Sequence, residues 1–447
     1  NCQVIHACFL EESATESRPE VAEQPDVKDA MLFALARLRQ WEIESILKTP
    51  WYYGWNIVGV SLVFQGVLFG SIFFSYTLWV GEWLDDGNLA VTLTYVMVPI
   101  TILNLAQSLM SPFAGYAMDR YSIRALICAG TTCAGVGYVL ISLTTEFWQI
   151  IAIYGTLIMA GVLLAGPLAA QTLAAKWFGK NRGLAIGIST TGTSIGGVVM
   201  APVVTLLHQS YGWRDAHWIL GVAFVAVILP LVWLAVRSPP RELGIEPESA
   251  GESVSASQER PERTWTMAEI LRQRTFWVVV LSFLPLVTAF GSIQQHLRPY
   301  AEILGVDSMQ TAFLISVFAT IMILAKLFFG TMADRFDHRG LFGLSLLACA
   351  VAVLGLLTSP AYSMLIVLSG LLGFSAGGFL PLLGAIVASR FGVASFGSVM
   401  GLLGPFLAAS AFGPMIFSML FQIHGNYNLA LWVALIVLIP GAVAMFF

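Results

Sequence analysis

The chain has 447 residues, of which 57% are hydrophobic and 11% charged, with a net charge of −4 and a mean hydropathy of +0.80. Soluble domains contain about 45–50% apolar and about 25% charged residues, so this composition excludes an ordinary soluble enzyme and a largely disordered chain. The negative charge, without a basic face, also argues against a nucleic-acid-binding protein. The apolar content is sufficient for about a dozen membrane crossings of roughly 20 residues each.

Residues 1–50 are polar, with nine acidic side chains against five basic ones, and we expect them to form a cytoplasmic N-terminal tail. They do not read as a secretory signal peptide, because no basic segment is followed by an apolar core and a small-residue cleavage site. Residues 29–48 place apolar side chains at helical spacing, which favours an amphipathic helix in the membrane interface. The chain begins at Asn1, so whether this tail is native is left open.

From Trp55 onward, apolar stretches long enough to cross a bilayer follow one another along the chain. There are twelve of them, expected at residues 55–80, 89–112, 124–143, 147–175, 183–208, 216–236, 276–297, 309–332, 340–358, 361–389, 396–423 and 427–447. Between the sixth and the seventh, residues 237–275 are rich in Pro, Ser and charge, which predicts a flexible cytoplasmic linker. The predicted domains are therefore a first six-helix bundle at 51–236 and a second at 276–447.

The positive charges predict the orientation of these spans. Nineteen of the 22 Lys and Arg lie in the N-terminal tail, in the linker or in loops after even-numbered spans. Arg214 and Arg298 lie on the opposite side, and Lys326 lies within a span. Because cytoplasmic loops are enriched in Lys and Arg, both termini are expected in the cytoplasm, with the protein in the plasma or inner membrane.

The two halves of the chain repeat one another. Residues 115–124 and 330–339 share the pattern G-x-x-x-D-R-x-x-x-R at an offset of 215. Farther along, Pro, Lys or Arg, Gly and Gly recur at an offset of 214, at Pro167, Lys176, Gly183 and Gly187 and at Pro381, Arg390, Gly397 and Gly401. Such matches imply a parallel duplication about an axis along the membrane normal.

The repeated G-x-x-x-D-R-x-x-x-R motif resembles the signature of the major facilitator superfamily. The resemblance implies an all-α membrane protein with twelve transmembrane helices in two pseudo-symmetric six-helix bundles. WYYGW at 51–55, the Gly66–Gly70 pair, AAKWFGKNRGLAIGISTTG at 174–192 and YGWR at 211–214 are similar to the monocarboxylate and oxalate–formate branch. Ser122 departs from the signature, where the family often has Gly, but the Asp and Arg positions remain.

In the superfamily this motif acts as a cytoplasmic latch that holds the outward-facing state. The resemblance assigns that gating role here to Gly115, Asp119, Arg120, Arg124, Gly330, Asp334, Arg335 and Arg339. From the residues themselves, the two aspartates are expected near the N-termini of the third and ninth spans, where a helix stabilises an anion. The arginines are expected to tie the short loops to neighbouring helix ends. The alternative is that the motif only anchors the topology.

Lys326 is the only charged residue in the interior of a predicted span, since Arg124 stands at the edge of the third one. It lies eight residues before Asp334, about 12 Å from the loop at 1.5 Å per residue. A central Lys costs about 2.5–3.5 kcal/mol on insertion scales, so such a group normally faces the protein interior or an aqueous cavity. Met322 and Gly330, one turn away on either side, offer it no carboxylate. The residues therefore suggest that its anionic partner is a substrate carboxylate.

The resemblance adds to this reading of Lys326. In related carriers an Arg at the matching position of span eight binds the substrate carboxylate, and the change to Lys loses bidentate geometry. Oxalate-type relatives carry a further Lys in span eleven, where this chain has no charge, so a monocarboxylate is expected. The alternative is that Lys326 snorkels to the cytoplasmic interface or bonds to backbone carbonyl groups.

Further polar side chains lie at depths where they could face a cavity. The candidate substrate-binding residues, besides Lys326, are Gln65, Tyr76, Tyr154, Gln171 and Arg298. The alternatives are contacts between helices for the buried residues and interface anchoring for Arg298. Because Met322 stands where relatives often have an Asp, an internal acid relay is doubtful. Candidates for proton coupling are Lys326, His208, His296 and the proton of the substrate, and exchange without protons stays open.

These features predict a secondary active transporter that moves a small organic monocarboxylate, similar to lactate or pyruvate, by alternating access. Coupling to protons and anion exchange are both consistent with the residues. No enzyme activity, cofactor or metal is expected, since the chain lacks a P-loop, an H-E-x-x-H motif and a serine elbow. The expected partners are the organic anion, a proton under proton coupling, and the lipid bilayer. The alternatives are a drug or neutral-metabolite exporter and a non-transporting receptor or scaffold.

Overall fold

A computed structural model describes residues 49–86, 89, 93–179, 181–237 and 264–446. The chain divides into two compact units, Asn1–Pro50 and Trp51–Phe447, and the account below concerns the second. The predicted tail helix at 29–48 lies outside the described residues, as does most of the predicted linker. All regular secondary structure in the described part is helical, as the apolar spans predicted.

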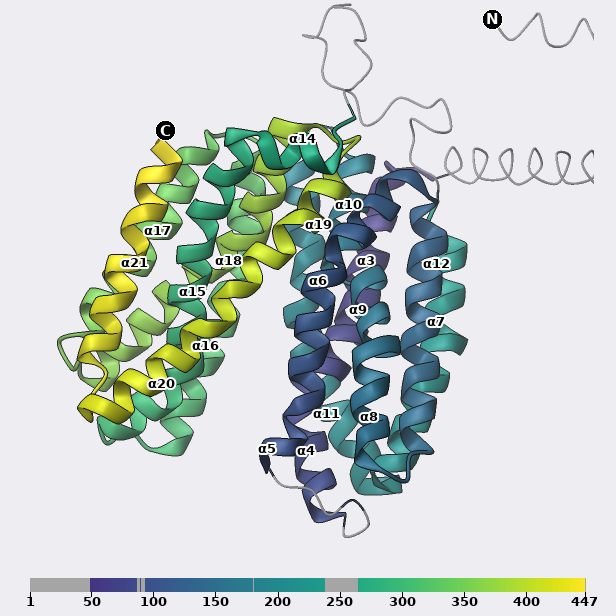
Figure 1. Cartoon of the computed structure of the whole chain (residues 1–447), viewed down its shortest axis with the longest axis horizontal. Coiled ribbons are helices and arrows are strands. Elements are labelled where there is room, and N and C mark those ends of the chain that lie inside the picture. The colour runs from purple at the N-terminus through teal and green to yellow at the C-terminus, as the bar shows by residue number, and fades with distance from the viewer. Residues whose placement is uncertain (1–48, 87–88, 90–92, 180, 238–263, 447) are drawn as a thin grey trace, which may run out of the picture. The chain divides into compact units, whose positions relative to one another are not determined.

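The first half of the sequence folds into helices that correspond to the first six predicted spans, and Figure 1 shows them packed together. Most of these spans are single helices or helices that continue through a π-helical turn. The second and fourth spans are instead divided into shorter helices near a proline or glycine. Their elements are α3 (Gly54–Phe69), η1 (Gly70–Phe74), α4 (Tyr76–Asp85), α5 (Leu93–Val96), α6 (Val98–Arg120), α7 (Ile123–Ser142), α8 (Phe147–Ile153), η2 (Tyr154–Ile158), α9 (Met159–Ala165), α10 (Pro167–Trp177), α11 (Arg182–Ala223), η3 (Phe224–Ile228) and α12 (Leu229–Ala235). The fifth and sixth crossings meet inside α11 at Gly212, whose φ of 81° only glycine adopts readily.

The second half contributes the other six crossings, preceded by a short helix from the end of the linker. The elements are α14 (Met267–Arg272), α15 (Arg274–Ile303), α16 (Ser308–Ala333), α17 (His338–Leu356), α18 (Tyr362–Phe391), α19 (Phe396–Leu407), η4 (Ala408–Ala411), α20 (Phe412–His424) and α21 (Asn428–Phe446). Each of the twelve predicted spans therefore has a helical counterpart. The helices extend beyond several predicted edges, for example to Arg120 in α6.

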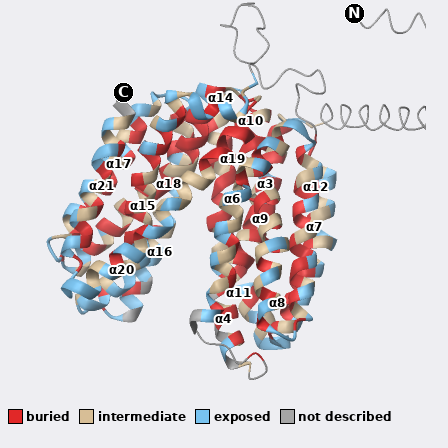
Figure 2. Cartoon of the chain, viewed as in Figure 1, coloured by how far each residue is buried: buried red, intermediate tan, exposed pale blue. Residues whose placement is uncertain are grey.

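Burial follows the pattern expected of helices that pack in lipid. Figure 2 shows buried residues along the faces where helices meet and exposed residues on the outer faces. Large apolar side chains are exposed there, such as Phe113 (64%) and Ile439 (58%). Nine helical stretches in the described part are long and apolar enough to cross a membrane. Continuous apolar surface of this kind is a lipid-facing surface rather than a solvated one.

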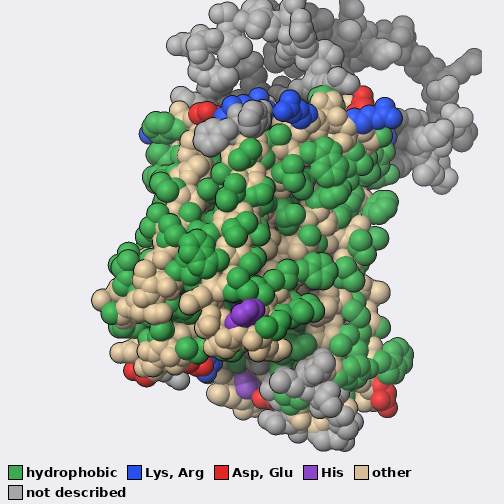
Figure 3. Space-filling view, turned by 60° about the vertical axis from the view of Figure 1, so that its left-hand side comes forward, with side chains coloured by type: hydrophobic (Ala, Val, Ile, Leu, Met, Phe, Trp, Pro, Cys, Tyr) green, Lys and Arg blue, Asp and Glu red, His purple; other side chains and the backbone are tan. Residues whose placement is uncertain are grey.

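Charge is segregated toward the ends of the helices. Figure 3 shows apolar side chains covering the flank of the molecule, with Lys and Arg gathered near one end. Asp119 and Asp334, the acids of the repeated motif, lie where α6 and α16 end. We call this the motif end. The segment that precedes α14 docks here, since the Trp265 backbone N–H donates to Ser395 Oγ at 2.8 Å.

Candidate functional site

The two halves join at the motif end through two pairs of helices related by the repeat. Between α6 and α19, a Cβ at Gly397 would lie 2.6 Å from the carbonyl oxygen of Gly115. Between α11 and α16, a Cβ at Gly330 would lie 2.6 Å from the carbonyl oxygen of Gly183. No side chain fits at either position, so glycine is what lets these backbones approach. The glycines of the repeat therefore form the contact between the halves.

The motif aspartates join the halves by capping helices across the contact. The Asp119 carboxylate accepts hydrogen bonds from the backbone N–H groups of Gly397 (2.9 Å) and Ser398 (2.6 Å), at the start of α19. The equivalent Asp334 accepts from Gly183 (2.6 Å) and Leu184 (2.9 Å), at the start of α11. The N-terminus of a helix carries partial positive charge, which stabilises each carboxylate.

This arrangement corrects one sequence expectation. We expected the two aspartates near the starts of the third and ninth spans, α7 and α17, but each caps a helix of the opposite half instead. The side chains that cap α7 and α17 are Ser122 and Asp337. Partial burial raises the pKa of the Asp334 carboxyl above its ordinary value, while the hydrogen bonds from Leu184 and Gly183 act in the opposite direction.

Two of the four motif arginines lie over aromatic rings. The guanidinium of Arg120 lies 4.8 Å from the ring centre of Tyr116, and that of Arg124 lies 5.0 Å from the ring centre of Trp233. Arg124 therefore connects the start of α7 to α12, a neighbouring helix end. Arg335 and Arg339 are exposed at the motif end.

Lys326 lies in the same contact, deeper in the bundle. Its side chain extends from α16 to α11, and only 4% of the residue is exposed. The ammonium Nζ donates to the carbonyl oxygen of Thr190 (3.0 Å), to Thr193 Oγ1 (3.1 Å) and to Ser194 Oγ (2.8 Å). Three acceptors satisfy the three donors of an ammonium group. The residue therefore neither snorkels nor points into lipid, and it joins the two halves.

The charge of Lys326 is not neutralised by the groups that it contacts. All three acceptors are neutral, and no carboxylate among the described residues lies within ion-pair distance of Nζ. A buried cation held only by neutral dipoles keeps a strong preference for an anion. The carbonyl contact with Thr190 is the alternative foreseen from the sequence, whereas the two hydroxyl contacts were not foreseen.

The repeat shows how unusual this lysine is. Ser111 of α6 stands 215 residues earlier, at the position that corresponds to Lys326. Its Oγ donates to the carbonyl oxygen of Gly401 at 2.7 Å, also across the contact between the halves. A hydroxyl is therefore enough to join the helices at this level. The ammonium of Lys326 adds a charge that packing does not require.

Of the two candidate glutamines, Gln65 contacts α11 and Gln171 lies beside α18. Gln65 is fully buried in α3, and its Nε2 donates to the carbonyl oxygen (2.9 Å) and Oγ (3.2 Å) of Ser189. Gln171 is buried in α10, where its Oε1 would lie 3.2 Å from a Cβ at Gly384 of α18. The Oε1 atoms of both glutamines have no hydrogen-bond partner among the described residues. The Oε1 of Gln65 remains available as an acceptor beside the segment that holds Lys326.

Sequence reasoning missed the hydroxyl-bearing segment itself. Residues 189–194 read Ser-Thr-Thr-Gly-Thr-Ser, with five hydroxyls in six residues of an apolar helix. Ser189 faces Gln65, while Thr190, Thr193 and Ser194 face Lys326. The density of hydroxyls was the available signal, because such residues in a membrane helix usually bond across to a neighbour.

Tyr76 and Tyr154 are brought together with each other but not with Lys326. Their rings meet edge to face with centres 5.8 Å apart, beside Trp83 in the first bundle. The Tyr76 hydroxyl donates to the carbonyl oxygen of Val96 at 2.7 Å. Among the described residues, the hydrogen bonds and ring contacts of these tyrosines do not reach α16. The Tyr154 hydroxyl has no hydrogen-bond partner in that part of the chain.

Arg298 also lies apart from Lys326. Its side chain is 65% exposed and pairs with Glu302, one turn farther along α15, at 2.8 Å. This pairing favours the surface-anchor alternative over a direct contact with substrate inside the bundle. The structure thus brings Lys326 and Gln65 to α11, places Gln171 beside α18, and leaves the other three candidates elsewhere.

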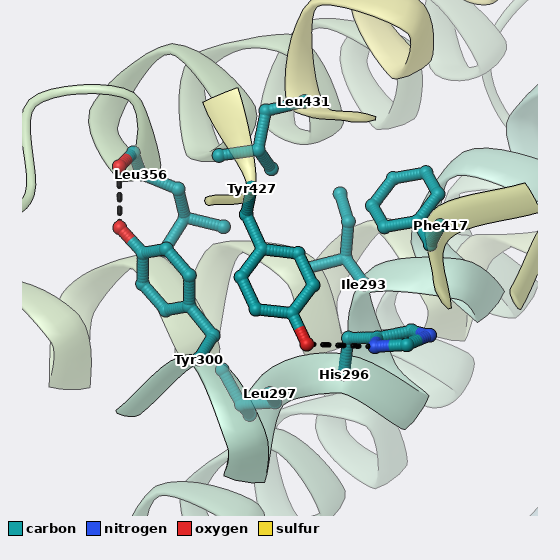
Figure 4. A pocket seen from close by; sticks show the side chains of 8 residues that line it. All are labelled: Ile293, His296, Leu297, Tyr300, Leu356, Phe417, Tyr427 and Leu431. Carbon is teal, nitrogen blue, oxygen red and sulfur yellow. Dashed lines mark hydrogen bonds between the residues drawn. The ribbon is translucent and has the colours of Figure 1, made fainter. Parts of the chain in front are cut away.

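Each of the two candidate coupling histidines contacts a side chain of its own bundle. His208 Nδ1 of α11 lies 3.1 Å from Glu82 Oε1 of α4. Figure 4 shows His296 beside the Tyr427 hydroxyl, with a separation of 3.0 Å at Nδ1. The cavity at His296 has a volume of about 10 Å³, which is about one water at most. An organic acid does not fit there.

Comparisons with known proteins match the chain over most of its length. The sequence pattern of the Major Facilitator Superfamily matches residues 62–325 and 297–447. The uncharacterized MFS-type transporter YcxA of Bacillus subtilis is 25% identical over 69% of this chain and 74% of its own length. Monocarboxylate transporter 12 of Xenopus laevis is 26% identical over 74% of this chain and 75% of its own length. The mouse protein of that name is 28% identical over 74% and 72%.

Solved structures share the fold. A crystal structure of the Escherichia coli fucose:proton symporter FucP superimposes with a TM-score of 0.64 and 13% identity, covering 88% of this chain and 97% of FucP. A double tryptophan mutant of XylE gives a TM-score of 0.64 at 17% identity, covering 88% of this chain and 95% of XylE. At these identities the likeness concerns the arrangement of helices alone.

Proposed function

Because this chain belongs to the Major Facilitator Superfamily, whose sequence pattern covers most of it, we propose that it transports a small organic monocarboxylate. Membership makes it an integral membrane transporter of a small molecule with twelve helices in two halves. The substrate class is our inference. Lactate and pyruvate represent the expected size and charge, with one carboxylate on a short carbon skeleton.

The observation that carries this proposal is the buried ammonium of Lys326. It is 4% exposed, it has three neutral acceptors, and it has no carboxylate partner among the described residues. A charged acceptor makes a shorter and stronger hydrogen bond to an ammonium than a hydroxyl does. A substrate carboxylate is therefore able to displace Thr193 and Ser194 from Nζ. The relatives named monocarboxylate transporter 12 support the same class of substrate.

In our proposal, substrate binding and the movement of the halves are linked through α16. Lys326 belongs to the second half and all three of its acceptors belong to α11 of the first. When the halves separate at the motif end, the ammonium has to exchange these acceptors for others. A bound carboxylate supplies a charged replacement, so the loaded carrier changes state more readily than the empty one. Alternating access of this kind needs no ATP.

The distribution of Lys and Arg indicates which side of the membrane the motif end faces in this cycle. The Lys and Arg of the loops favour the motif end as the cytoplasmic one, so the present conformation is closed toward the cytoplasm. Coupling either uses the proton of the substrate acid or proceeds as anion exchange. An acidic relay on α16 is not part of the proposal, because Met322 stands one turn before Lys326.

The test is uptake of labelled lactate, pyruvate, formate and oxalate into proteoliposomes that contain the full chain. Lys326→Gln removes the cation and keeps a polar side chain of similar length, whereas Lys326→Arg keeps the charge. We expect the wild type to take up a monocarboxylate. Lys326→Gln should lose at least about tenfold in kcat/KM, since hydrogen bonds to charged groups contribute about 1.5–3 kcal/mol. Lys326→Arg should retain a substantial part of the uptake. An imposed pH gradient separates proton coupling from exchange.

Two outcomes would contradict the proposal. One is unchanged uptake kinetics in Lys326→Gln at equal protein content in the vesicles. The other is transport of neutral or cationic compounds with no uptake of the four acids, which would indicate an exporter. Binding without any flux would instead indicate a receptor.

A further inference from the structure

A cluster of cations lies on the surface of the second bundle at the motif end, apart from Lys326. A cavity of about 180 Å³ is bounded by the start of α15, the start of α17 and the end of α18. Arg274, Arg339 and Arg390 line it, together with His338 and a single acid, Asp337. The transport proposal uses neither the cavity nor Arg274 and Arg390.

The charges of this cavity are not balanced within the protein. Asp337 is the N-cap of α17, where its Oδ1 accepts from the backbone N–H of Arg339 at 3.3 Å. Within the described part of the chain, the three guanidinium groups have no ion pair or hydrogen bond to another side chain. Three cations facing one acid leave an excess of positive charge in a partly enclosed space, which favours an anion.

The internal repeat provides an independent comparison. Arg339 corresponds to Arg124, and Arg390 corresponds to Lys176. In the first half these cations are held by the protein itself. Arg124 lies 5.0 Å from the ring centre of Trp233, and Lys176 Nζ donates to the carbonyl oxygen of Met118 at 2.9 Å. In the second half, the corresponding Arg339 and Arg390 line the cavity.

We propose that the cavity formed by Arg274, Arg339 and Arg390 binds a phosphate-bearing anion. Guanidinium groups pair with phosphate oxygens in a bidentate manner, which gives both strength and orientation. The cavity lies where three apolar helices begin or end, which in our proposal is the level of the lipid headgroups. Basic pockets between transmembrane helices at such a depth bind anionic lipid headgroups, and a free phosphate ion presents the same chemistry.

The apolar part of the lining suits the same ligand. Val278, Val279 and Ile386 form the inner wall, while the arginines lie at the exposed rim. A lipid phosphate can therefore bind at the rim while its acyl chains follow the apolar flank of α15 or α18. Because the site bridges three helices of one half, its occupancy stabilises the second bundle.

The experiment measures lipid retention by the full chain with native mass spectrometry in detergent. Phosphatidylglycerol and phosphatidylcholine with identical acyl chains are compared, and a parallel arm measures the shift in Tm caused by inorganic phosphate against chloride. The variant is Arg274→Gln with Arg390→Gln. The matched control is Arg272→Gln, an exposed arginine of α14 that does not line the cavity.

We expect the wild type and Arg272→Gln to retain one more molecule of phosphatidylglycerol than of phosphatidylcholine. In the double variant the apparent affinity for phosphatidylglycerol should fall by about tenfold, so that this preference is lost. If phosphate raises the Tm of the wild type but not of the double variant, and the wild type shows no preference between the two lipids, the bound anion is free phosphate. Each single variant gives a partial loss, which keeps the test open should the double variant aggregate. Equal retention of both lipids with no phosphate effect, or equal behaviour of variant and control, overturns the proposal.

Discussion

At the scale of single residues, Lys326 determines how this chain is understood. Its sequence context showed a cation without a carboxylate on its own helix, and the structure shows the same for its contacts in the described chain. The acceptors that hold it come from Thr190, Thr193 and Ser194, more than 130 residues away. No local pattern links these positions, because the spacing that brings them together exists only between helices of different halves.

The two hydroxyl acceptors offer a test of the contact that is separate from substrate binding. Replacing Thr193 by Val together with Ser194 by Ala leaves the ammonium with one neutral acceptor in this conformation. Since hydrogen bonds to charged groups contribute about 1.5–3 kcal/mol each, we expect the closed motif end to be destabilised. The measurement is the distance between spin labels at Tyr121 and Phe336, two exposed loop residues of opposite halves, in a background without native cysteines.

Thr191→Val is the matched control for this variant. Its hydroxyl donates to the carbonyl oxygen of Ile188 in its own helix at 2.6 Å and does not contact Lys326. The longer-distance population should rise in the double variant and stay unchanged in the control. Identical distance distributions in all three proteins would mean that the hydroxyls do not hold the halves together.

At the scale of elements, glycines decide which helices meet. The pairs α6–α19 and α11–α16 approach at Gly115 and Gly397 and at Gly183 and Gly330, where backbone contacts backbone. The sequence showed these glycines at repeated offsets and indicated close packing. It did not show that the packing lies between the halves, because a G-x-x-x-G pattern carries no information on its partner helix.

We expect Gly115→Ala to prevent full closure of the motif end. The added methyl group would overlap the carbonyl oxygen of Gly397, and backbone cannot move aside as a flexible side chain can. Transport should fall by about tenfold or more, with the spin-label distance between Tyr121 and Phe336 lengthened. Gly343→Ala in α17 is the control, since a Cβ there meets nothing within 4 Å. Wild-type distances in Gly115→Ala would show that the contact tolerates a methyl group.

At the scale of the whole molecule, the repeat places one carboxylate cap on each side of the contact between the halves. Asp119 caps α19 and Asp334 caps α11, so the two caps act in parallel on one equilibrium. A charge at a helix N-terminus contributes about 0.3–1 kcal/mol, and up to about 2 when partly buried. In our proposal the two caps together favour the conformation that is closed at the motif end, so the motif acts as a latch and not only as an anchor.

The prediction is that Asp119→Asn and Asp334→Asn each raise the population open at the motif end, and that the double variant raises it further. The effects should be nearly additive, because the two sites share no residue. Asp337→Asn is the control, since it weakens the cap of α17 within one half only. The same pair of spin labels reports the populations. An equal shift in the Asp337 variant would assign the effect to helix stability rather than to the contact between halves.

The sequence by itself determined the membrane class, the twelve helices, the repeat and the isolated charge at Lys326, because hydropathy, spacing and composition are local properties of a chain. Only the tertiary structure decided which helix each motif aspartate caps, that the hydroxyls of α11 hold the lysine, and that Arg298 and the tyrosines lie elsewhere. These depend on the packing of helices that are distant in sequence. Which helix packs against which depends on the shapes and hydrogen-bonding groups of the two helix surfaces, and these surfaces exist only after the helices have formed.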